Sequence, residues 1–322
     1  MPDAASGRLR RLAEELDESG LRLAGTEALR ALLIDEIDHA LRPVVHERKV
    51  ASCGAIVEPT SDPATWEAGA QLEITHGPVD QPLTDARRFA DGLSSWIVRR
   101  TDGTSEWMVF DRPAGSERDL VVLAGAFGAT IVQRHPTGAV RVVGPFGVLR
   151  WQGFTWHHEP PVSSWFDTVT ASSDHGDPGV LEAMLEFAVH DLGSRGIGAL
   201  LIYRPDTEPG PRVEERLPTP PPLRITRASH LAPLRHALAQ VDGAAIFDAE
   251  GVLRRLGVRL VPSNDAEAAV EALGGTRHTS GRRYSFDDPR ATVIAVSEDG
   301  PVSVLRDASV LGRSYTADDR DL

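Results

Sequence analysis

The stretch Val241-Asp242-Gly243-Ala244-Ala245-Ile246-Phe247 places an acid and a glycine directly before an apolar run that predicts a buried strand. Glycine has no side chain, so the backbone at Gly243 can approach a ligand closely. A carboxylate at Asp242 could bind a divalent cation or accept a proton from a hydroxyl group. An Asp-Gly pair is also typical of an ordinary turn that leads into a strand, and this segment alone leaves both interpretations open.

A second segment, Gly274-Gly275-Thr276-Arg277-His278-Thr279-Ser280-Gly281, combines paired glycines with hydroxyl groups, a guanidinium and an imidazole. Such groups suit phosphate oxygens, to which a guanidinium can donate two parallel hydrogen bonds. The alternative is a loop that follows a helix C-cap at Gly274. The chain has a single lysine, Lys49, and no glycine-rich loop precedes it, which excludes a P-loop. Phosphates would therefore have to be bound by arginines, backbone amides and a metal.

Two further stretches frame these segments, Gly196-Ile197-Gly198-Ala199-Leu200-Leu201-Ile202-Tyr203 upstream and Ala295-Val296-Ser297-Glu298-Asp299-Gly300-Pro301-Val302-Ser303-Val304 downstream. Here the sequence resembles the diadenylate cyclase (DAC) domain family. That family shows an Ile-Gly-Ala-Leu-Ile-Val strand, an Asp-Gly-Ala motif, a Gly-Thr-Arg-His-Arg motif and a Val-Ser-Glu-Glu hairpin. All four landmarks occur here in that order at similar separations, and the resemblance covers roughly residues 178–310.

The resemblance implies an α/β fold, with a mixed sheet flanked by helices, that joins two ATP molecules into cyclic di-AMP with the help of Mg²⁺ or Mn²⁺. In the family each domain binds one ATP. Two domains meet face to face, so that each 3′-hydroxyl reaches the α-phosphate held by the partner. The implied partners are therefore ATP and a second copy of the chain in a homo-oligomer.

The resemblance also implies roles for single residues. Asp242 would bind the metal and favour formation of the 3′-oxyanion, and Glu298 is a second candidate metal ligand. Gly243 and Ala244 would pack beside the nucleotide. Leu260 matches a stretch whose backbone reads adenine. The residues implied to bind the phosphates of ATP are Thr276, Arg277, His278 and Thr279.

One of these residues departs from the family pattern. Where the family has Arg-His-Arg, this chain has Arg277-His278-Thr279. The loss of one charge-assisted hydrogen bond costs ~1.5–3 kcal/mol, or roughly one to two decades in rate if it is fully expressed in the transition state. Arg282 or Arg283, a few residues further on, could supply the missing charge.

The motifs leave three interpretations of function. Asp242 favours an active diadenylate cyclase. Thr279 favours a catalytically weak or inactive DAC-like domain that binds ATP or a cyclic dinucleotide and acts as a sensor. The third interpretation is an unrelated α/β scaffold in which the motifs coincide by chance. Detection of cyclic di-AMP after incubation with ATP and a divalent metal would separate the first from the other two.

The composition limits the partners and the compartment. The 322 residues include 34 basic and 47 acidic ones, which gives a net charge of −13 at pH 7 and argues against non-specific nucleic-acid binding. No apolar stretch approaches the ~20 residues that a membrane span needs, and the N-terminus lacks a secretory signal. A single cysteine, Cys53, cannot form an internal disulfide. We expect a cytoplasmic protein without a membrane span.

We expect four parts along the chain. They are a helical segment at 1–45, a strand-rich sensor or assembly module at 46–170, a DAC-like catalytic domain at 171–315 and a tail at 316–322.

Local patterns predict elements within these parts. Apolar positions spaced three and four residues apart predict a helix between Gly25 and Pro43 and others at 181–192, 234–240 and 265–273, the last opened by Asn264. Apolar runs bounded by turn residues predict strands at 94–98, 106–110, 119–123, 129–133, 139–143, 197–203, 244–247, 292–296 and 302–305.

Overall fold

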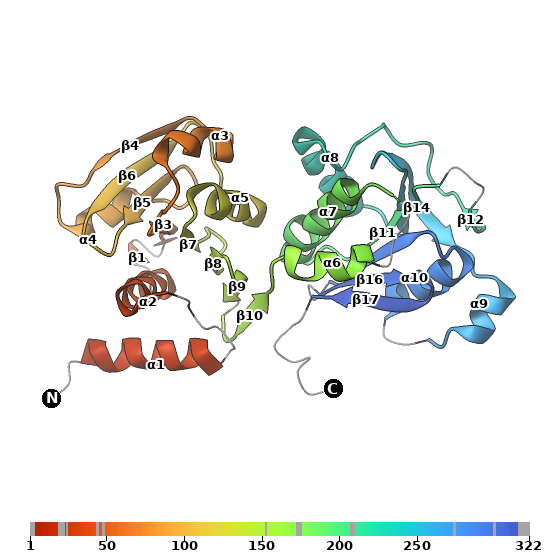
Figure 1. Ribbon diagram of the computed structural model, residues 1–322, viewed down its shortest axis with the longest axis horizontal. Helices are drawn as coiled ribbons and strands as arrows, with labels where there is room; N and C mark the ends of the chain where they lie inside the picture. The colour runs from red at the N-terminus through yellow and green to blue at the C-terminus, as the bar shows by residue number, and fades with distance from the viewer. Residues whose placement is uncertain are drawn as a thin grey trace. The chain divides into compact units, whose positions relative to one another are not determined.

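A computed structural model describes residues 4–18, 23, 25–42, 45–46, 49–151, 153–171, 176–206, 210–272, 275–298 and 301–314 (Figure 1). The chain forms two compact units, one that extends to Pro161 and one that begins at Val162. Each unit combines helices with a mixed sheet, so the predicted α/β class is confirmed, with a strand-rich first module. Among the described residues, no helix has the length and apolar character that a membrane span requires.

The first unit is built on an eight-stranded sheet in the order β10-β9-β8-β7-β3-β5-β6-β4, in which only β3 and β5 are parallel neighbours. A two-stranded ribbon, β1–β2, stands apart from it. The strands are β1 (Val45–His46), β2 (Lys49–Val50), β3 (Cys53–Val57), β4 (Ile74–Pro78), β5 (Ser95–Arg99), β6 (Ser105–Phe110), β7 (Thr130–Arg134), β8 (Val140–Gly144), β9 (Gly147–Trp151) and β10 (Trp156–Glu159). The helices are α1 (Ala4–Glu18), α2 (Glu27–Leu41), η1 (Pro63–Thr65), α3 (Trp66–Ala70), α4 (Leu83–Ala86), η2 (Arg87–Phe89) and α5 (Glu117–Phe127).

Helices cover both faces of this sheet. Successive side chains of a strand point to opposite faces. Ala55 and Val57 of β3 accordingly lie in one apolar cluster with Ile37 of α2, whereas Ile56 lies in another with Leu120 of α5. The predicted helix between Gly25 and Pro43 is confirmed as α2, and it starts at the N-cap Thr26, whose hydroxyl accepts from the Leu29 amide.

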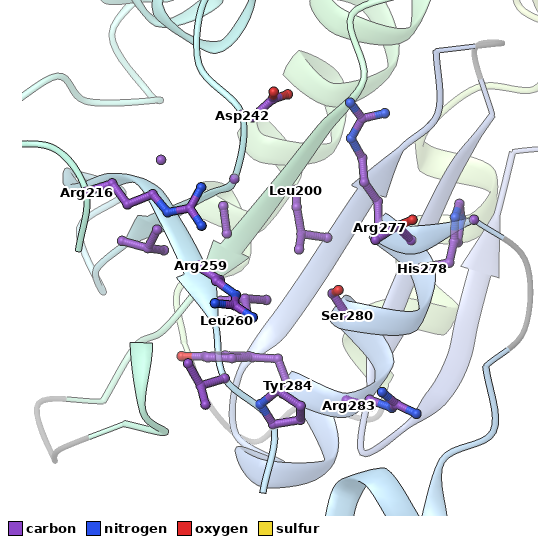
Figure 2. Close-up of a pocket in the computed structure, with 18 of the residues that line it drawn as sticks. Leu200, Arg216, Asp242, Arg259, Leu260, Arg277, His278, Ser280, Arg283 and Tyr284 are labelled. Atoms are coloured by element: carbon purple, nitrogen blue, oxygen red, sulfur yellow. The ribbon is translucent and has the colours of Figure 1, made fainter. Parts of the chain in front are cut away.

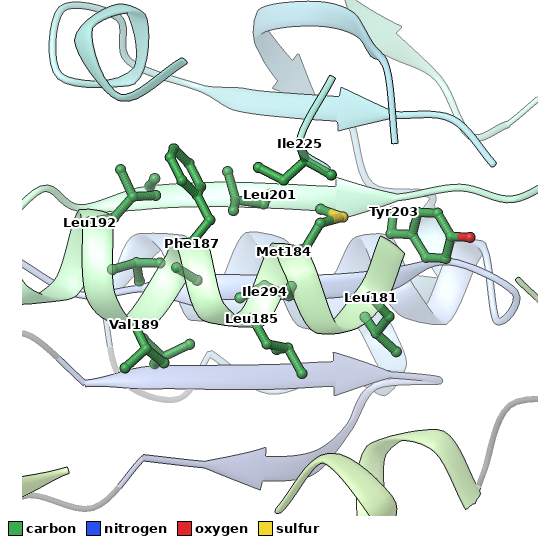
Figure 3. Close-up of a cluster of buried hydrophobic side chains, with 14 of the residues drawn as sticks. Leu181, Met184, Leu185, Phe187, Val189, Leu192, Leu201, Tyr203, Ile225 and Ile294 are labelled. Carbon is green, nitrogen blue, oxygen red and sulfur yellow. The ribbon is translucent and has the colours of Figure 1, made fainter. Parts of the chain in front are cut away.

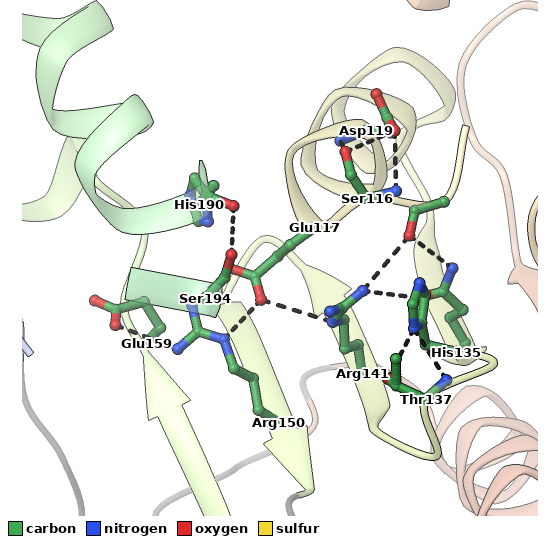
Figure 4. Close-up of polar contacts among 12 residues, drawn as sticks. Ser116, Glu117, Asp119, His135, Thr137, Arg141, Arg150, Glu159, His190 and Ser194 are labelled. Carbon is green, nitrogen blue, oxygen red and sulfur yellow. Dashed lines mark hydrogen bonds and ion pairs between the residues drawn. The ribbon is translucent and has the colours of Figure 1, made fainter. Parts of the chain in front are cut away.

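The predicted strand at 119–123 is wrong, because these residues lie in helix α5. Ser116 and Asp119 form a reciprocal capping box at its start (Figure 4). Gly128 ends it in the left-handed conformation, with φ of 58°. The apolar run by itself favours a strand, but the capping residues on both sides specify a helix.

The second unit has a seven-stranded sheet in the order β12-β14-β13-β11-β15-β16-β17, in which only β11 and β13 are parallel neighbours. The strands are β11 (Ala199–Tyr203), β12 (Val213–Glu214), β13 (Ala244–Phe247), β14 (Leu253–Leu260), β15 (Thr292–Val296), β16 (Val302–Arg306) and β17 (Ser309–Arg313). The helices are α6 (Ser163–Ala171), α7 (Pro178–Phe187) with a π-helical continuation η3 (Ala188–Leu192), η4 (Gly193–Arg195), α8 (Ala228–Leu238), α9 (Asn264–Ala269) and α10 (Thr276–Asp287).

Two apolar clusters lie on opposite faces of this sheet. Met184 and Leu185 of α7 pack with Leu201 of β11 on one face (Figure 3). Leu200, the preceding residue of β11, lies on the other face in a cluster with Tyr284 of α10. The central strands are therefore covered on both sides, as their uninterrupted apolar sequences require.

Helix α10 is not among the predicted elements, and the alternative of a loop after a C-cap at Gly274 is wrong from Thr276 onward; Gly274 itself lies outside the described residues. The sequence of α10 has no apolar stripe. It packs on the sheet through Gly281, where an added Cβ would lie 3.0–3.2 Å from Leu305, Val293 and Leu200. A further correction concerns α9, which is capped by the Ser263 hydroxyl and not by Asn264.

Candidate functional site

A cavity of about 920 Å³ opens beside the start of β13, the end of β14 and the first turns of α10 (Figure 2). Eight of the nine predicted site residues line it: Asp242, Gly243, Ala244, Leu260, Thr276, Arg277, His278 and Glu298. Thr279 is not among the lining residues. The fold thus gathers residues from four separate stretches of sequence around one space.

Gly243 holds the Asp242 carboxylate at the edge of this cavity. Its φ is +110°, and a Cβ there would lie 2.8 Å from backbone atoms of Gly257 and Val258, so only glycine fits. Asp242 is exposed, and its carboxylate has no hydrogen bond or ion pair within the described part of the chain. The Asp-Gly pair therefore presents a free carboxylate to the cavity.

The first turn of α10 supplies backbone donors. Its N-cap is Gly275, which has no side chain to accept a hydrogen bond, so the first amide N–H groups lack a side-chain acceptor. Thr276, Arg277 and His278 occupy this turn. Unsatisfied amides and the helix dipole make such a turn favourable for an anion. Thr279 instead donates its backbone N–H to Gly275 within the helix.

Arg277 forms an ion pair with Glu298 across the cavity wall, with 3.0 Å between Nη2 and Oε1. Gly198 makes room for this pair, because a Cβ there would lie 2.2 Å from Arg277 Nη1 and 2.8 Å from Glu298 Cγ. The two side chains are 37% and 69% exposed, so the pair is weak and a phosphate could replace the carboxylate. Gly198, which immediately precedes strand β11, therefore leaves the space that the Arg277–Glu298 pair occupies.

The His278 imidazole is half-buried, and its Nε2 lies 3.1 Å from the Ser303 hydroxyl. Burial, followed by the charge of Arg313, lowers the pKa of His278 below its ordinary value. The lowered pKa favours the neutral ring, which has one nitrogen as donor and the other as acceptor.

Asp242 and Glu298 could hold a divalent metal only if a bound ligand supplied further atoms that coordinate the metal. Among the described residues no three or more His, Cys, Asp or Glu side chains cluster as metal ligands would. Asp242 offers an unpartnered carboxylate, whereas Glu298 is engaged by Arg277. Mg²⁺ is commonly held by one or two carboxylates together with waters and substrate phosphates, and Asp242 suits that mode.

Several lining residues were not predicted. Arg216, Arg259, Ser280 and Tyr284 also face the cavity, and Figure 2 shows the Arg216 guanidinium directed toward its middle. Ser280 and Tyr284 are four residues apart on α10 and would have been found had the helix been predicted. No sequence signal marks Arg216, which lies in an irregular, proline-rich segment. Of the two arginines considered as replacements for the missing charge, Arg283 lines this cavity and Arg282 does not.

Comparisons with known proteins give two family matches. Residues 10–159 match the model described as "Probable sensor domain DACNK", and residues 186–310 match the DAC model, described as "DisA bacterial checkpoint controller nucleotide-binding". A search of the curated proteins found no match.

Two solved structures illustrate the similarity. A hypothetical membrane spanning protein from Bacillus cereus is 17% identical, with 43% of this chain and 70% of that chain aligned at a TM-score of 0.29. A double mutant of DacA from Staphylococcus aureus is 19% identical, with 48% of this chain and 89% of that chain aligned at a TM-score of 0.26. TM-scores this low do not by themselves establish a shared fold. The family models do identify the two parts: the chain carries a DAC nucleotide-binding domain at residues 186–310, preceded by a DACNK domain at residues 10–159.

Proposed function

We propose that the chain is a diadenylate cyclase, which condenses two ATP molecules into cyclic di-AMP and releases two pyrophosphates. The observation that carries the proposal is that the free Asp242 carboxylate and the first turn of α10 line the same cavity. The same cavity can thus hold a metal beside a hydroxyl group and also hold phosphates. Phosphoryl-group transfer depends mainly on such positioning and charge stabilisation.

In the proposed reaction the 3′-oxygen of one ATP forms a bond to the α-phosphorus of the other. The bond from that phosphorus to the bridging oxygen breaks, its electron pair leaves with pyrophosphate, and the hydroxyl proton passes to solvent. Mg²⁺ or Mn²⁺, when bound at Asp242, would supply positive charge beside the reacting oxygen. The amides of Thr276–His278 and the Arg277 guanidinium orient the phosphates. For this, Arg277 leaves its ion pair with Glu298 and donates to a phosphate oxygen instead.

The nucleophile comes from a second nucleotide, so the proposal requires two domains face to face. Product formation per protomer should then rise with enzyme concentration in the range where the protein is dissociated. A rate per protomer that stays constant on dilution, with only monomer seen by size-exclusion chromatography, would contradict this arrangement.

We also propose that residues 46–170 act as a sensor or assembly module. The boundaries between the four parts, at residues 45, 170 and 315, stay predictions. A location in the cytoplasm also stays a prediction.

The direct test is incubation of the full chain with ATP and Mg²⁺ or Mn²⁺, followed by mass spectrometry of the products. We expect cyclic di-AMP from the wild type and none from Asp242→Asn, because an amide keeps the shape of the side chain but not the charge that holds a cation. Asp265→Asn, an exposed position on α9 outside the cavity, is the matched control. Normal turnover by Asp242→Asn would rule out the assigned role.

The second candidate function is a nucleotide-binding sensor without catalysis. Its chief support was Thr279, but this residue does not line the cavity, whereas Arg283 does. The same experiment separates the two functions, since a sensor would bind ATP in calorimetry and yield no cyclic di-AMP.

A further inference from the structure

A second cavity, of about 530 Å³, adjoins the first on the side of strands β16 and β17. It is lined by Gly275, His278, Arg282, Ser297, Leu305, Ala308, Ser309, Val310 and Arg313. Gly275, His278 and Ser297 line both cavities. The two cavities therefore lie side by side at the first turn of α10.

The lining of this second cavity is strongly basic. Arg282 comes from α10 and Arg313 from the end of β17, and none of the described lining residues is acidic, in a chain of net charge −13. Arg282 donates from Nε to the Ala308 carbonyl at 3.0 Å, and Arg313 donates from Nε to the Ser303 hydroxyl at 3.3 Å. Within the described part of the chain, neither guanidinium has an ion pair. Their terminal nitrogens remain available to an anion.

Ser303 links Arg313 to His278 at the wall between the cavities. Its side chain is fully buried, and its hydroxyl lies 3.1 Å from His278 Nε2. The same hydroxyl lies 3.3 Å from Arg313 Nε, so Ser303 contacts a side chain from each of the two cavities.

We propose that the second cavity binds the β- and γ-phosphates of ATP, and pyrophosphate after its release, through Arg282 and Arg313. The proposal rests on the proposed function in one respect, that ATP occupies the adjoining cavity. Guanidinium groups match phosphate oxygens in geometry and charge. Pyrophosphate gains negative charge as it leaves, so two unpaired arginines beside it would stabilise the transition state.

The test measures binding by isothermal titration calorimetry with the full chain and needs no turnover. The probes are ATP, AMP, inorganic pyrophosphate and inorganic phosphate. The variants are Arg282→Gln, Arg313→Gln and their combination, with Arg313→Lys to retain the charge. Arg254→Gln, an exposed arginine that lines neither cavity, is the control, and thermal melting confirms folding.

We expect each glutamine variant to weaken binding of ATP and pyrophosphate by about tenfold or more, with AMP affinity unchanged. Pyrophosphate should bind more tightly than phosphate, and Arg313→Lys should lose less than Arg313→Gln. Unchanged ATP and pyrophosphate affinities in the folded double variant would overturn the proposal, as would an equal loss for AMP or a wild type that binds no pyrophosphate. If the variants lose pyrophosphate as expected but the wild type makes no cyclic di-AMP, the cyclase function fails while the anion site stands.

Discussion

The arginines at the two cavities of the second unit differ from the buried arginines of the first unit. In the first unit Arg150 donates two hydrogen bonds of 2.6 Å to the buried Glu117 carboxylate (Figure 4), and Arg87 binds the buried Glu36 at 2.6 Å. In the second unit the arginines at the cavities are either in an exposed pair, as Arg277 is, or have no acidic partner in the described residues, as Arg282 and Arg313 are. A buried pair is fixed by the cost of separating its charges, whereas an unpaired guanidinium at a cavity can bind an incoming anion. Arg87 and Arg150 are therefore held by buried carboxylates, as is Arg204 by Asp288 in the second unit, whereas the arginines at the cavities are available for ligands.

The largest expected effect is loss of a buried partner in the first unit. Glu117→Gln should lower the free energy of unfolding by about 3–5 kcal/mol, because it leaves the Arg150 charge buried without its main counterion. Urea denaturation followed by circular dichroism measures this, with the exposed Glu73→Gln as the matched control. A change within about 0.5 kcal/mol would show that this pair resembles the exposed ones.

The next effect depends on pH. Burial, followed by the charge of Arg87, lowers the pKa of His39 to about 4, from an ordinary value near 6.5. Between these values the unfolded chain binds a proton that folded His39 does not, so acidification favours unfolding. Because His39 is only partly buried, solvent screening reduces the effect, and the free energy of unfolding of the wild type should fall relative to His39→Gln by about 1–2 kcal/mol from pH 7.5 to 4.5.

Denaturation curves of both proteins at each pH provide the comparison for His39. Subtracting one from the other removes the titrations they share, including that of neighbouring Glu36, whose pKa burial raises. A difference that does not change with pH would contradict the assignment.

A smaller effect should follow from Gly198→Ala in the second unit. The new Cβ would collide with the Arg277 guanidinium, a flexible group that can move away, so the fold should persist while Arg277 leaves its position. We expect ATP affinity to fall about tenfold in calorimetry, with little change in melting temperature. Gly125→Ala, where an added Cβ meets nothing within 4 Å, controls for the substitution itself. Undiminished ATP affinity would mean that Arg277 does not contact the nucleotide.

The smallest effect on stability is expected for Glu298→Gln. Because this side chain is 69% exposed, loss of its pair with Arg277 should change the free energy of unfolding by less than about 0.5 kcal/mol. A cost of several kcal/mol in denaturation experiments would show that the ion pair is structural and would weaken the contrast between the units.

Much of the second unit follows from its sequence. Strands β13 and β15 have the predicted bounds, because a continuous apolar run between turn residues indicates where a strand begins and ends. Helices α5 and α10 could not be read from periodicity. In α5 the apolar residues are consecutive, and in α10 small and polar residues pack against the sheet through Gly281.

Some residues of the candidate site can likewise be predicted from the sequence, and others cannot. Asp242 and Arg277 belong to compact motifs and were found by them. Arg216 and Arg313 reach the cavities from an irregular segment and from a strand end. Their role depends on which strands pair, and a local pattern carries no information about that.

The order of the central strands has a consequence for folding kinetics. Strand β11 pairs through Leu200 with Ala244 and through Ala199 with Val296, partners that are distant in sequence. The entropy of closing these long loops must be overcome before the pairs gain stability, so their formation is slow compared with that of α7 or α10 alone. Asp242 precedes one of these partners and Glu298 follows the other, so these two lining residues come together only after β11 has both neighbours. Competence to bind nucleotide should therefore appear late in refolding, after most of the helical signal has returned.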